Sequence, residues 1–353
     1  MVFLSQAVTN PAGNARISDH GVVEFTSEKT AMESLRPLGR SPIVLSAIGL
    51  GCWQFSEGHG FAGRYWPSLP QETVNQIVKA SLIGGITWFD TAEVYGRGRS
   101  EAALARALMA AGSKNGDVVI ATKWWPILRA AGSIKATISE RLDRLAPFEI
   151  DLYQVHQPFA LASTIAQMQA MADLVAGNKI RTVGVSNFSA GKMRAAHQAL
   201  TARGIPLVSN QVPYSLLNRK IETNGVLQAA RELGTTIIAY SPLAQGILSG
   251  KFHQDPNLIR SRPGPRKWMT AFQREGLERS RPLVTALNEI ARQYGATASQ
   301  VALNWLVHSS GDTVVAIPGA TSATQAAENA GALGFRLTAS EQKRLEELSR
   351  QFR

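Results

Sequence analysis

Four polar residues stand at or just after the ends of short apolar runs, and their types could do proton-transfer chemistry together. Asp90 ends GITWFD, and Tyr95 follows five residues later in DTAEVYG. Lys123 ends VVIATK, and His156 ends DLYQVH. The chain thus offers an acid, a phenol, an amine and an imidazole at intervals that leave room for a helix between successive strands. This regularity favours one joint site.

These four groups match what reduction of a carbonyl group needs besides a hydride donor. A phenol has a pKa of about 10 and is a weak acid at neutral pH unless its surroundings perturb it. A nearby ammonium lowers such a pKa, so we expect Lys123 to act in this way on Tyr95. Asp90 would keep Lys123 charged. His156 would orient the carbonyl and stabilise its developing negative charge.

Each residue also has a simpler interpretation when it is taken alone. Asp90 could cap the helix that follows it. Tyr95 could be a half-buried packing residue, Lys123 a solvated lysine at a strand end, and His156 a buried histidine with its hydrogen bonds satisfied. The joint occurrence of the four residues favours the catalytic interpretation.

The elements that would position these residues are eight short runs of aliphatic and β-branched residues. Most are almost continuously apolar, as in parallel strands that are covered on both faces. Helical patterns separate successive runs, and several end at glycine. The predicted strands are 44–51, 85–90, 118–123, 151–156, 182–187, 206–211, 235–241 and 313–319.

A strand and a helix repeated eight times predict an α/β fold, a (β/α)8 TIM barrel whose site forms at the C-terminal ends of the strands. Before the first strand, LRPLGRSPIVLS predicts a hairpin that turns near Gly39–Ser41 and plugs the barrel floor. Two helices, in SATQAAENAGAL and SEQKRLEELSRQ, follow the last strand. The alternative is a doubly wound open sheet, but no GxGxxG motif follows the first strand.

Length and composition favour one domain, since no low-complexity or linker segment divides the 353 residues. Residues 1–35 lack apolar periodicity and are predicted to be a flexible extension, with the barrel domain over 36–353. The single cysteine, Cys52, excludes an internal disulfide and indicates a reducing, cytoplasmic location. No apolar run approaches the roughly 18 residues of a spanning helix, so no membrane partner is expected.

The net charge of +11 does not by itself indicate a nucleic-acid partner, because the basic residues are scattered through the predicted helices. Only Arg260–Arg281 is locally basic. This basic stretch lies within a long insertion, 242–312, between the seventh and eighth strands, and suits a small phosphorylated ligand as well as a polynucleotide.

Several motifs together resemble the aldo-keto reductase family over residues 36–350. They are GLGCW, FDTAEVYG, TK at 122–123, GVSNF, NQVPYSLLNR, YSPLAQGILSGKF and IPGATSATQAAEN. The branch with potassium-channel β-subunits and with plant and bacterial reductases is the most similar. The resemblance implies NADPH-dependent reduction of a small aldehyde or ketone, with Tyr95 as the general acid and without a metal. It also permits a cofactor-occupied regulatory or docking subunit with little turnover; the oligomeric state is left open.

The resemblance also assigns the cofactor-binding residues. It gives the nicotinamide ring to Tyr240, and its carboxamide to Ser186, Asn187 and Gln211. The pyrophosphate would be lined by Ser241, Pro242, Leu243, Gln245, Gly246 and Lys251. The adenosine half would be held by Gly319, Thr321, Gln325, Glu328 and Asn329.

The choice between NADPH and NADH depends on the contacts of the 2′-phosphate. The positions that match the family's contacts carry Thr321 and Gln325, which are not basic. Arg260, Arg262 and Arg266 of the insertion could supply the charge instead. This arrangement favours NADPH and leaves NADH open.

Aromatic residues follow the strand ends and predict a wall around the substrate. Trp53, Trp124 and Trp125 are the candidate substrate-binding residues, beside the loop QFSEGHGFAGRYWPSLP. They suggest an aromatic or ring-bearing aldehyde or ketone. Where the family often has His-x-Pro-Asp, this chain has His156-Gln157-Pro158-Phe159. The imidazole is kept, and the rim beside it changes.

Overall fold

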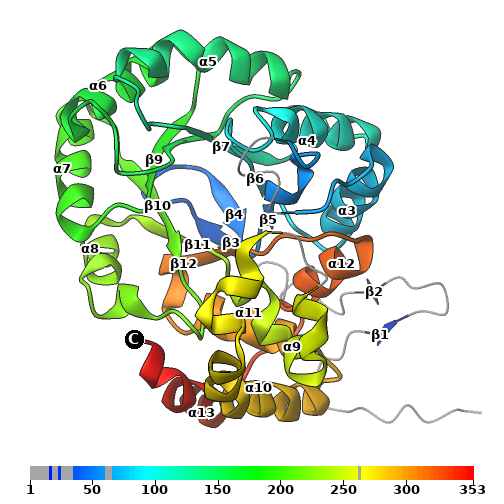
Figure 1. Ribbon diagram of the computed structural model, residues 1–353. Helices are drawn as coiled ribbons and strands as arrows, with labels where there is room; N and C mark the ends of the chain where they lie inside the picture. Colours follow the sequence, from blue (N-terminus) through cyan, green and yellow to red (C-terminus); the bar gives the residue numbers. More distant parts are fainter. Residues whose placement is uncertain (1–15, 18–22, 25–34, 60–65, 261–263) are drawn as a thin grey trace, which may run out of the picture.

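The computed structural model describes residues 16–17, 23–24, 35–59, 66–260 and 264–353 (Figure 1). Eight parallel strands, β5 to β12, lie side by side in chain order. Ile48 bridges to Ala316 and Gly51 to Gly319, so the first strand meets the last and the sheet closes. The (β/α)8 barrel is therefore confirmed. Its strands are β5 Leu50–Gly51, β6 Trp88–Asp90, β7 Val119–Trp124, β8 Leu152–Val155, β9 Thr182–Ser186, β10 Leu207–Pro213, β11 Thr236–Tyr240 and β12 Val314–Ile317.

The predicted first strand, 44–51, is in fact two elements. Its first part, β4 (Val44–Ser46), pairs antiparallel with β3 (Leu35–Pro37) in a hairpin, and only Leu50–Gly51 joins the barrel. Between them the Ser46 hydroxyl donates to the Ile48 carbonyl at 2.6 Å, and the Ser46 amide donates to the Thr87 hydroxyl at 2.9 Å. These bonds turn the chain from the hairpin into the barrel, and an apolar run alone does not reveal them.

The hairpin plugs one end of the barrel, as predicted. Leu38, Ile43 and Leu45 are buried and pack against inward-facing residues of the strands. Gly39 has a φ of +54°, and a Cβ there would lie 2.6 Å from the Val208 carbonyl oxygen. The turn therefore needs glycine to approach the strand so closely. The packing partners include Trp88, Leu152, Val208, Ile238 and Val315.

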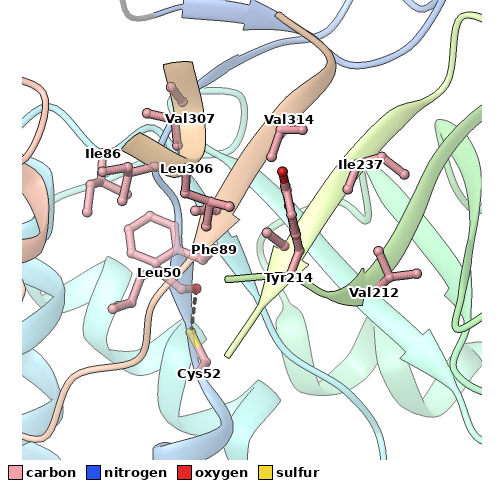
Figure 2. Packing of buried hydrophobic residues seen from close by; sticks show 14 of the residues in the cluster. Leu50, Cys52, Ile86, Phe89, Val212, Tyr214, Ile237, Leu306, Val307 and Val314 are labelled. Carbon is pink, nitrogen blue, oxygen red and sulfur yellow. Dashed lines mark hydrogen bonds between the residues drawn. The ribbon is translucent and has the colours of Figure 1, made fainter. Parts of the chain in front are cut away.

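Helices cover the outer face of the barrel and bury the apolar outer residues of the strands. Figure 2 shows part of this layer, with side chains from β5, β6, β10, β11 and β12 beside Leu306 and Val307 of helix α11. The helices that follow β5 to β10 are α3 Gln71–Ile83, α4 Arg99–Ala110, α5 Gly132–Leu145, α6 Thr164–Ala176, α7 Ala190–Thr201 and α8 Val226–Leu233.

The long insertion before the last strand is helical over most of its second half. Helices α9 (Lys251–Gln254), α10 (Arg274–Tyr294) and α11 (Ala298–His308) lie between β11 and β12. Helix α10 begins at Arg274 and runs through Pro282. After β12, α12 (Ala323–Gly331) and α13 (Ala339–Ser349) are the two predicted closing helices.

The predicted extension 1–35 lies mainly outside the described residues. Of it, β1 (Arg16–Ile17) pairs antiparallel with β2 (Val23–Glu24), and Leu35 already belongs to β3. None of the helices in the described part of the chain is both long and apolar enough to cross a membrane.

Candidate active site

A buried ion pair joins the ends of β6 and β7 inside the barrel. Lys123 Nζ pairs with the Asp90 carboxylate and donates to the Thr91 carbonyl at 2.8 Å. Lys123 is 0% and Asp90 1% exposed. Gln154 and Gln211 donate to the second carboxylate oxygen of Asp90 at 3.2 and 2.8 Å. Because burial without a partner would be costly for either charge, these contacts fix both side chains in one position.

Tyr95 lies in the loop after β6, at the mouth of the same cluster. The Lys123 ammonium is 5.2 Å from the centre of its ring. The ring meets the His156 imidazole edge to face at 5.6 Å and stacks on Trp53 at 6.0 Å. The structure therefore brings together Asp90, Tyr95, Lys123 and His156.

The expected lowering of the Tyr95 pKa is wrong for this structure. Burial, followed by the Asp90 charge, raises the pKa of the phenol well above its ordinary value. The ammonium of Lys123 is paired with Asp90, which offsets its effect on the phenol. Tyr95 thus keeps its proton at neutral pH, which is the state that a proton donor requires.

His156 follows β8, and its ring is positioned by neighbours on two sides. Its backbone N–H donates to the Trp124 carbonyl at 3.0 Å, and Trp125 packs against the ring at 5.2 Å. Burial and the nearby Lys123 charge lower the pKa of the imidazole well below its usual value, so the ring is neutral. Its Nδ1 has no hydrogen-bond partner among the described residues. An unpartnered buried nitrogen is uncommon and marks a place where a polar group can bind.

The residues assigned to the nicotinamide gather beside this cluster, at the ends of β9, β10 and β11. The Tyr240 hydroxyl donates to Asn187 Oδ1 at 3.0 Å, and the Asn187 amide donates to Ser186 Oγ at 3.1 Å. The Ser186 hydroxyl donates to the Gln211 carbonyl at 2.9 Å. Asn187 has a φ of +61°, which most side chains avoid. These amide and hydroxyl groups have the donors and acceptors that suit a carboxamide.

The segment after β11, assigned to the pyrophosphate, has an unusual backbone. Ser241, Ala244 and Gln245 all have positive φ values, of 50°, 47° and 55°. Non-glycine residues in this region store strain and concentrate at ligand sites. A Cβ on Gly246 would come within 3.3 Å of Lys251 Nζ, so a cation lies against the loop. Strained backbone beside a lysine fits an anionic group. Pro242 and Leu243 lie in the same loop.

The residues assigned to the adenosine half surround the start of α12. The Thr321 amide and hydroxyl both donate to Gln325 Oε1, at 2.9 and 3.0 Å. Asn329 donates to the Gly319 carbonyl at 3.4 Å, while Glu328 is partly exposed one residue before it. Gly319 has a further role, because a Cβ there would overlap Gln54 at 2.0 Å.

The basic residues assigned to the 2′-phosphate are only partly described. Arg260 is exposed and follows the short 3-10 helix Pro256–Ile259. Arg262 and the side chain of Arg266 lie outside the described residues. Their contact with a phosphate therefore stays a prediction.

Two of the three tryptophans assigned to the substrate lie at the site, and one does not. Trp53 contacts Tyr95, and Trp125 contacts His156. Trp124 is 0% exposed and donates to Ser133 of α5 at 3.1 Å, so its assignment as a substrate-binding residue is wrong. Side chains alternate along a strand, and with Lys123 inside the barrel Trp124 must point outward. Phe159, which stands where the family resemblance often places aspartate, is 65% exposed.

Two polar residues of the cluster were missed from the sequence. Gln154 holds Asp90 from β8, and its own Oε1 accepts from Ser209 of β10 at 3.4 Å. Both are 0% exposed. The available signal was a glutamine within LYQV, a strand whose residues are all buried.

The family model for the aldo/keto reductase family matches residues 47–350. An uncharacterized oxidoreductase of Mycobacterium tuberculosis is 40% identical over 311 residues, which cover 88% of this chain and 91% of that protein. The chloroplastic pyridoxal reductase of Arabidopsis thaliana is 33% identical, with 86% and 83% covered. A solved Klebsiella pneumoniae aldo/keto reductase in complex with NADP and acetate has a TM-score of 0.67 at 26% identity, with 89% and 94% covered. The chain belongs to the aldo-keto reductase family of oxidoreductases.

Proposed function

We propose that the protein reduces an aldehyde or ketone to an alcohol with NADPH and that Tyr95 is the general acid. One observation carries the proposal: the Tyr95 ring lies 5.2 Å from the Lys123 ammonium and 5.6 Å from the His156 ring. A carbonyl oxygen placed between the phenol and the imidazole could accept a hydrogen bond from each. Both donors would stabilise the negative charge that develops on this oxygen.

The residues have separate roles in this mechanism. Bound NADPH would supply the hydride. Tyr95 gives its phenolic proton to the developing alkoxide, and Lys123 stabilises the phenolate that remains. Asp90 holds Lys123 in place, and Gln154 and Gln211 hold Asp90 by donating to its second carboxylate oxygen. His156 donates from a ring nitrogen and orients the carbonyl.

Several features support the assignment of NADPH as the cofactor. Ser186, Asn187, Gln211 and Tyr240 have the chemistry to hold a carboxamide, and the strained loop beside Lys251 suits a pyrophosphate. The Klebsiella pneumoniae relative is solved with NADP. We infer that arginines between 260 and 266 contact the 2′-phosphate.

Replacing Arg260, Arg262 and Arg266 by alanine tests the 2′-phosphate assignment. A charge-assisted bond is worth roughly 1.5 to 3 kcal/mol, so KM for NADPH should rise about 10- to 150-fold while KM for NADH stays unchanged. Steady-state kinetics with both cofactors measures this. Equal losses for the two cofactors, or none, would move the site to Lys251 and the start of α12.

The aromatic rim supports a ring-bearing substrate. Trp53 and Trp125 both contact members of the candidate catalytic cluster. The Arabidopsis thaliana relative is named a pyridoxal reductase, which is consistent with a heteroaromatic aldehyde. We therefore propose aromatic aldehydes, with pyridoxal as the first to test. A panel of pyridoxal, benzaldehyde and linear alkanals of equal carbon number should give higher kcat/KM for the ring compounds.

A further inference from the structure

A second buried charge cluster lies behind the catalytic one, on the outer face of β7. Glu93 accepts hydrogen bonds from the guanidinium groups of Arg129 and Arg141. Arg141 also donates to Glu101 at 2.9 Å. Glu93, Glu101 and Arg141 are 9%, 0% and 2% exposed. The proposed reaction uses none of these four residues.

Glu93 extends the pairing of β6 with β7 beyond the end of the strand. The Thr91 amide donates to the Ala121 carbonyl at 2.8 Å, and the Glu93 amide donates to the Lys123 carbonyl at 3.3 Å. At the next position the Trp125 amide donates to the Glu93 side chain. The carboxylate thus takes the place of a backbone carbonyl where the chain turns away toward Tyr95.

This position connects Glu93 to the reacting groups without contact to them. Tyr95 follows Glu93 by two residues in the same loop, and the Trp125 ring packs on His156 at 5.2 Å. Arg129, which donates to Glu93, also donates to the Trp125 carbonyl at 3.1 Å, so it holds the contact between Glu93 and Trp125. The relative position of the Tyr95 phenol and the His156 imidazole therefore depends on the contact between Glu93 and Trp125.

We propose that Glu93 is a positioning residue that sets Tyr95 and, through Trp125, His156 for proton transfer. Arg141 holds the Glu93 carboxylate in the orientation that accepts from Trp125, and Glu101 holds Arg141. The inference rests on the proposed function, because it concerns the alignment of the proposed acid. It assigns Glu93 no proton transfer of its own.

Glu93→Gln is the main test, because the amide keeps an oxygen for the Trp125 N–H but cannot neutralise two guanidinium groups. Misplacement of reacting groups by about 1 Å can cost roughly 10²-fold. We expect kcat for an aromatic aldehyde to fall about 10-fold in Glu93→Gln and about 10²-fold in Glu93→Ala. The Kd of NADPH, measured by fluorescence, should stay within about twofold of the parent.

A kinetic isotope effect separates misalignment from partial loss of folded protein. With NADPH deuterated at the transferred position, the isotope effect on kcat should rise in Glu93→Gln, because hydride transfer becomes slower relative to product release. A smaller active fraction would lower kcat and leave the isotope effect unchanged, and that result would overturn the proposal. So would a kcat of Glu93→Gln within about threefold of the parent. If Glu93→Ala does not fold, the Gln variant decides.

Glu140→Gln is the matched control. Glu140 contacts the Arg141 guanidinium at 3.1 Å, but the Glu140 side chain is 55% exposed. Its neutral variant should keep kcat and the isotope effect of the parent. A loss of kcat as large as that of Glu93→Gln would show that kcat depends on neutralisation of the Arg141 charge and not on the position of Glu93.

A readout without turnover separates this inference from the proposed function. In protein labelled with fluorotryptophan, the fluorine NMR resonance of Trp125 is the one that disappears in Trp125→Phe. This resonance should shift or broaden in Glu93→Gln and stay in place in Glu140→Gln. An unmoved resonance would overturn the positioning role even if the enzyme is active. If the parent reduces no aldehyde or ketone, the proposed function fails, and this resonance still decides whether Glu93 positions Trp125.

Discussion

Strand β7 separates two buried charge clusters. They differ in composition and in whether their polar groups are all paired within the described residues. Inside the barrel, Lys123 pairs with Asp90, and Nδ1 of the neighbouring His156 has no hydrogen-bond partner among the described residues. Outside, Thr122 donates to Glu101 at 2.6 Å, and Arg141 joins Glu101 to Glu93. The outer charges are satisfied by one another. The inner cluster is therefore suited to chemistry and the outer one to positioning.

The two clusters also use different cations, for a physical reason. Burial lowers the pKa of Lys123, opposed by Asp90, so the charge of the inner cation responds to its surroundings. Arginine stays protonated in proteins and bonds two carboxylates through a rigid planar group. A permanent charge with fixed geometry serves positioning, whereas a lysine can be coupled to the ionisation of a phenol.

The largest effect is expected when the inner cluster loses Tyr95, the proposed acid. Tyr95→Phe removes one hydroxyl and keeps the ring that stacks on Trp53. General acid catalysis contributes about 10² to 10⁴ in rate, so kcat should fall by that factor while NADPH still binds. Single-turnover kinetics and a fluorescence titration measure the two quantities. A kcat near that of the parent would show that Tyr95 is not the acid.

Loss of the imidazole should have a smaller effect on the same step. His156→Ala removes one proposed donor to the carbonyl, and we expect a loss on the order of 10²-fold in kcat for small aldehydes. Since the pKa of His156 is lowered, its donor is neutral and the parent rate should not fall as pH rises through the usual histidine range. A pH–rate profile checks this. A large loss of NADPH affinity in the variant would place His156 in the cofactor pocket instead.

The outer cluster should appear in the pH dependence of stability. Burial raises the pKa of Glu101 to about 7 from an ordinary value of 4.5. A carboxyl whose pKa is raised on folding stabilises the native state below its unfolded pKa, and this contribution is lost as pH rises through the folded pKa.

Glu101→Gln tests this assignment. The free energy of unfolding of the parent, relative to the variant, should fall between about pH 5 and about pH 8. Urea unfolding across this range measures the difference. A difference that rises with pH would mean that Arg141 outweighs burial and holds the pKa of Glu101 below its ordinary value.

The smallest effect is expected for changes to the N-terminal segment. Removal of residues 1–34 should leave kcat and the Tm unchanged, because the segment has no apolar periodicity with which to join a core. Residues 35–37 stay, since β3 begins there. An inactive or insoluble truncated protein would show that the domain boundary is misplaced.

The barrel and the inner cluster could be predicted because their signals are local. Most of the strands from β6 to β12 are short apolar runs, and the polar residues at or just after the ends of β6, β7 and β8 indicate the face of the candidate site. Alternation along β7 could also have shown that Trp124 points outward once Lys123 was placed inside. The first strand was misjudged because Ser46 and Thr87, from different segments, turn the chain there.

The outer cluster could not be predicted in the same way. Glu93 and Arg141 are separated by 48 residues, and nothing in the pattern of either segment indicates the other. The direction of the Tyr95 pKa shift likewise depends on how deeply the phenol is buried and on the pairing of Lys123 with Asp90. The outer cluster and the Tyr95 pKa shift both depend on packing among segments that are far apart in the sequence.

The central claim, that the inner cluster reduces a carbonyl group, is tested most directly by mixing the protein with NADPH and an aromatic aldehyde such as pyridoxal. Loss of NADPH absorbance and formation of the alcohol are followed together, with Tyr95→Phe alongside. We predict equal amounts of NADPH consumed and alcohol formed in the parent, and a rate about 10² to 10⁴ lower in the variant. Bound NADPH without turnover of any aldehyde or ketone in the parent would contradict the account.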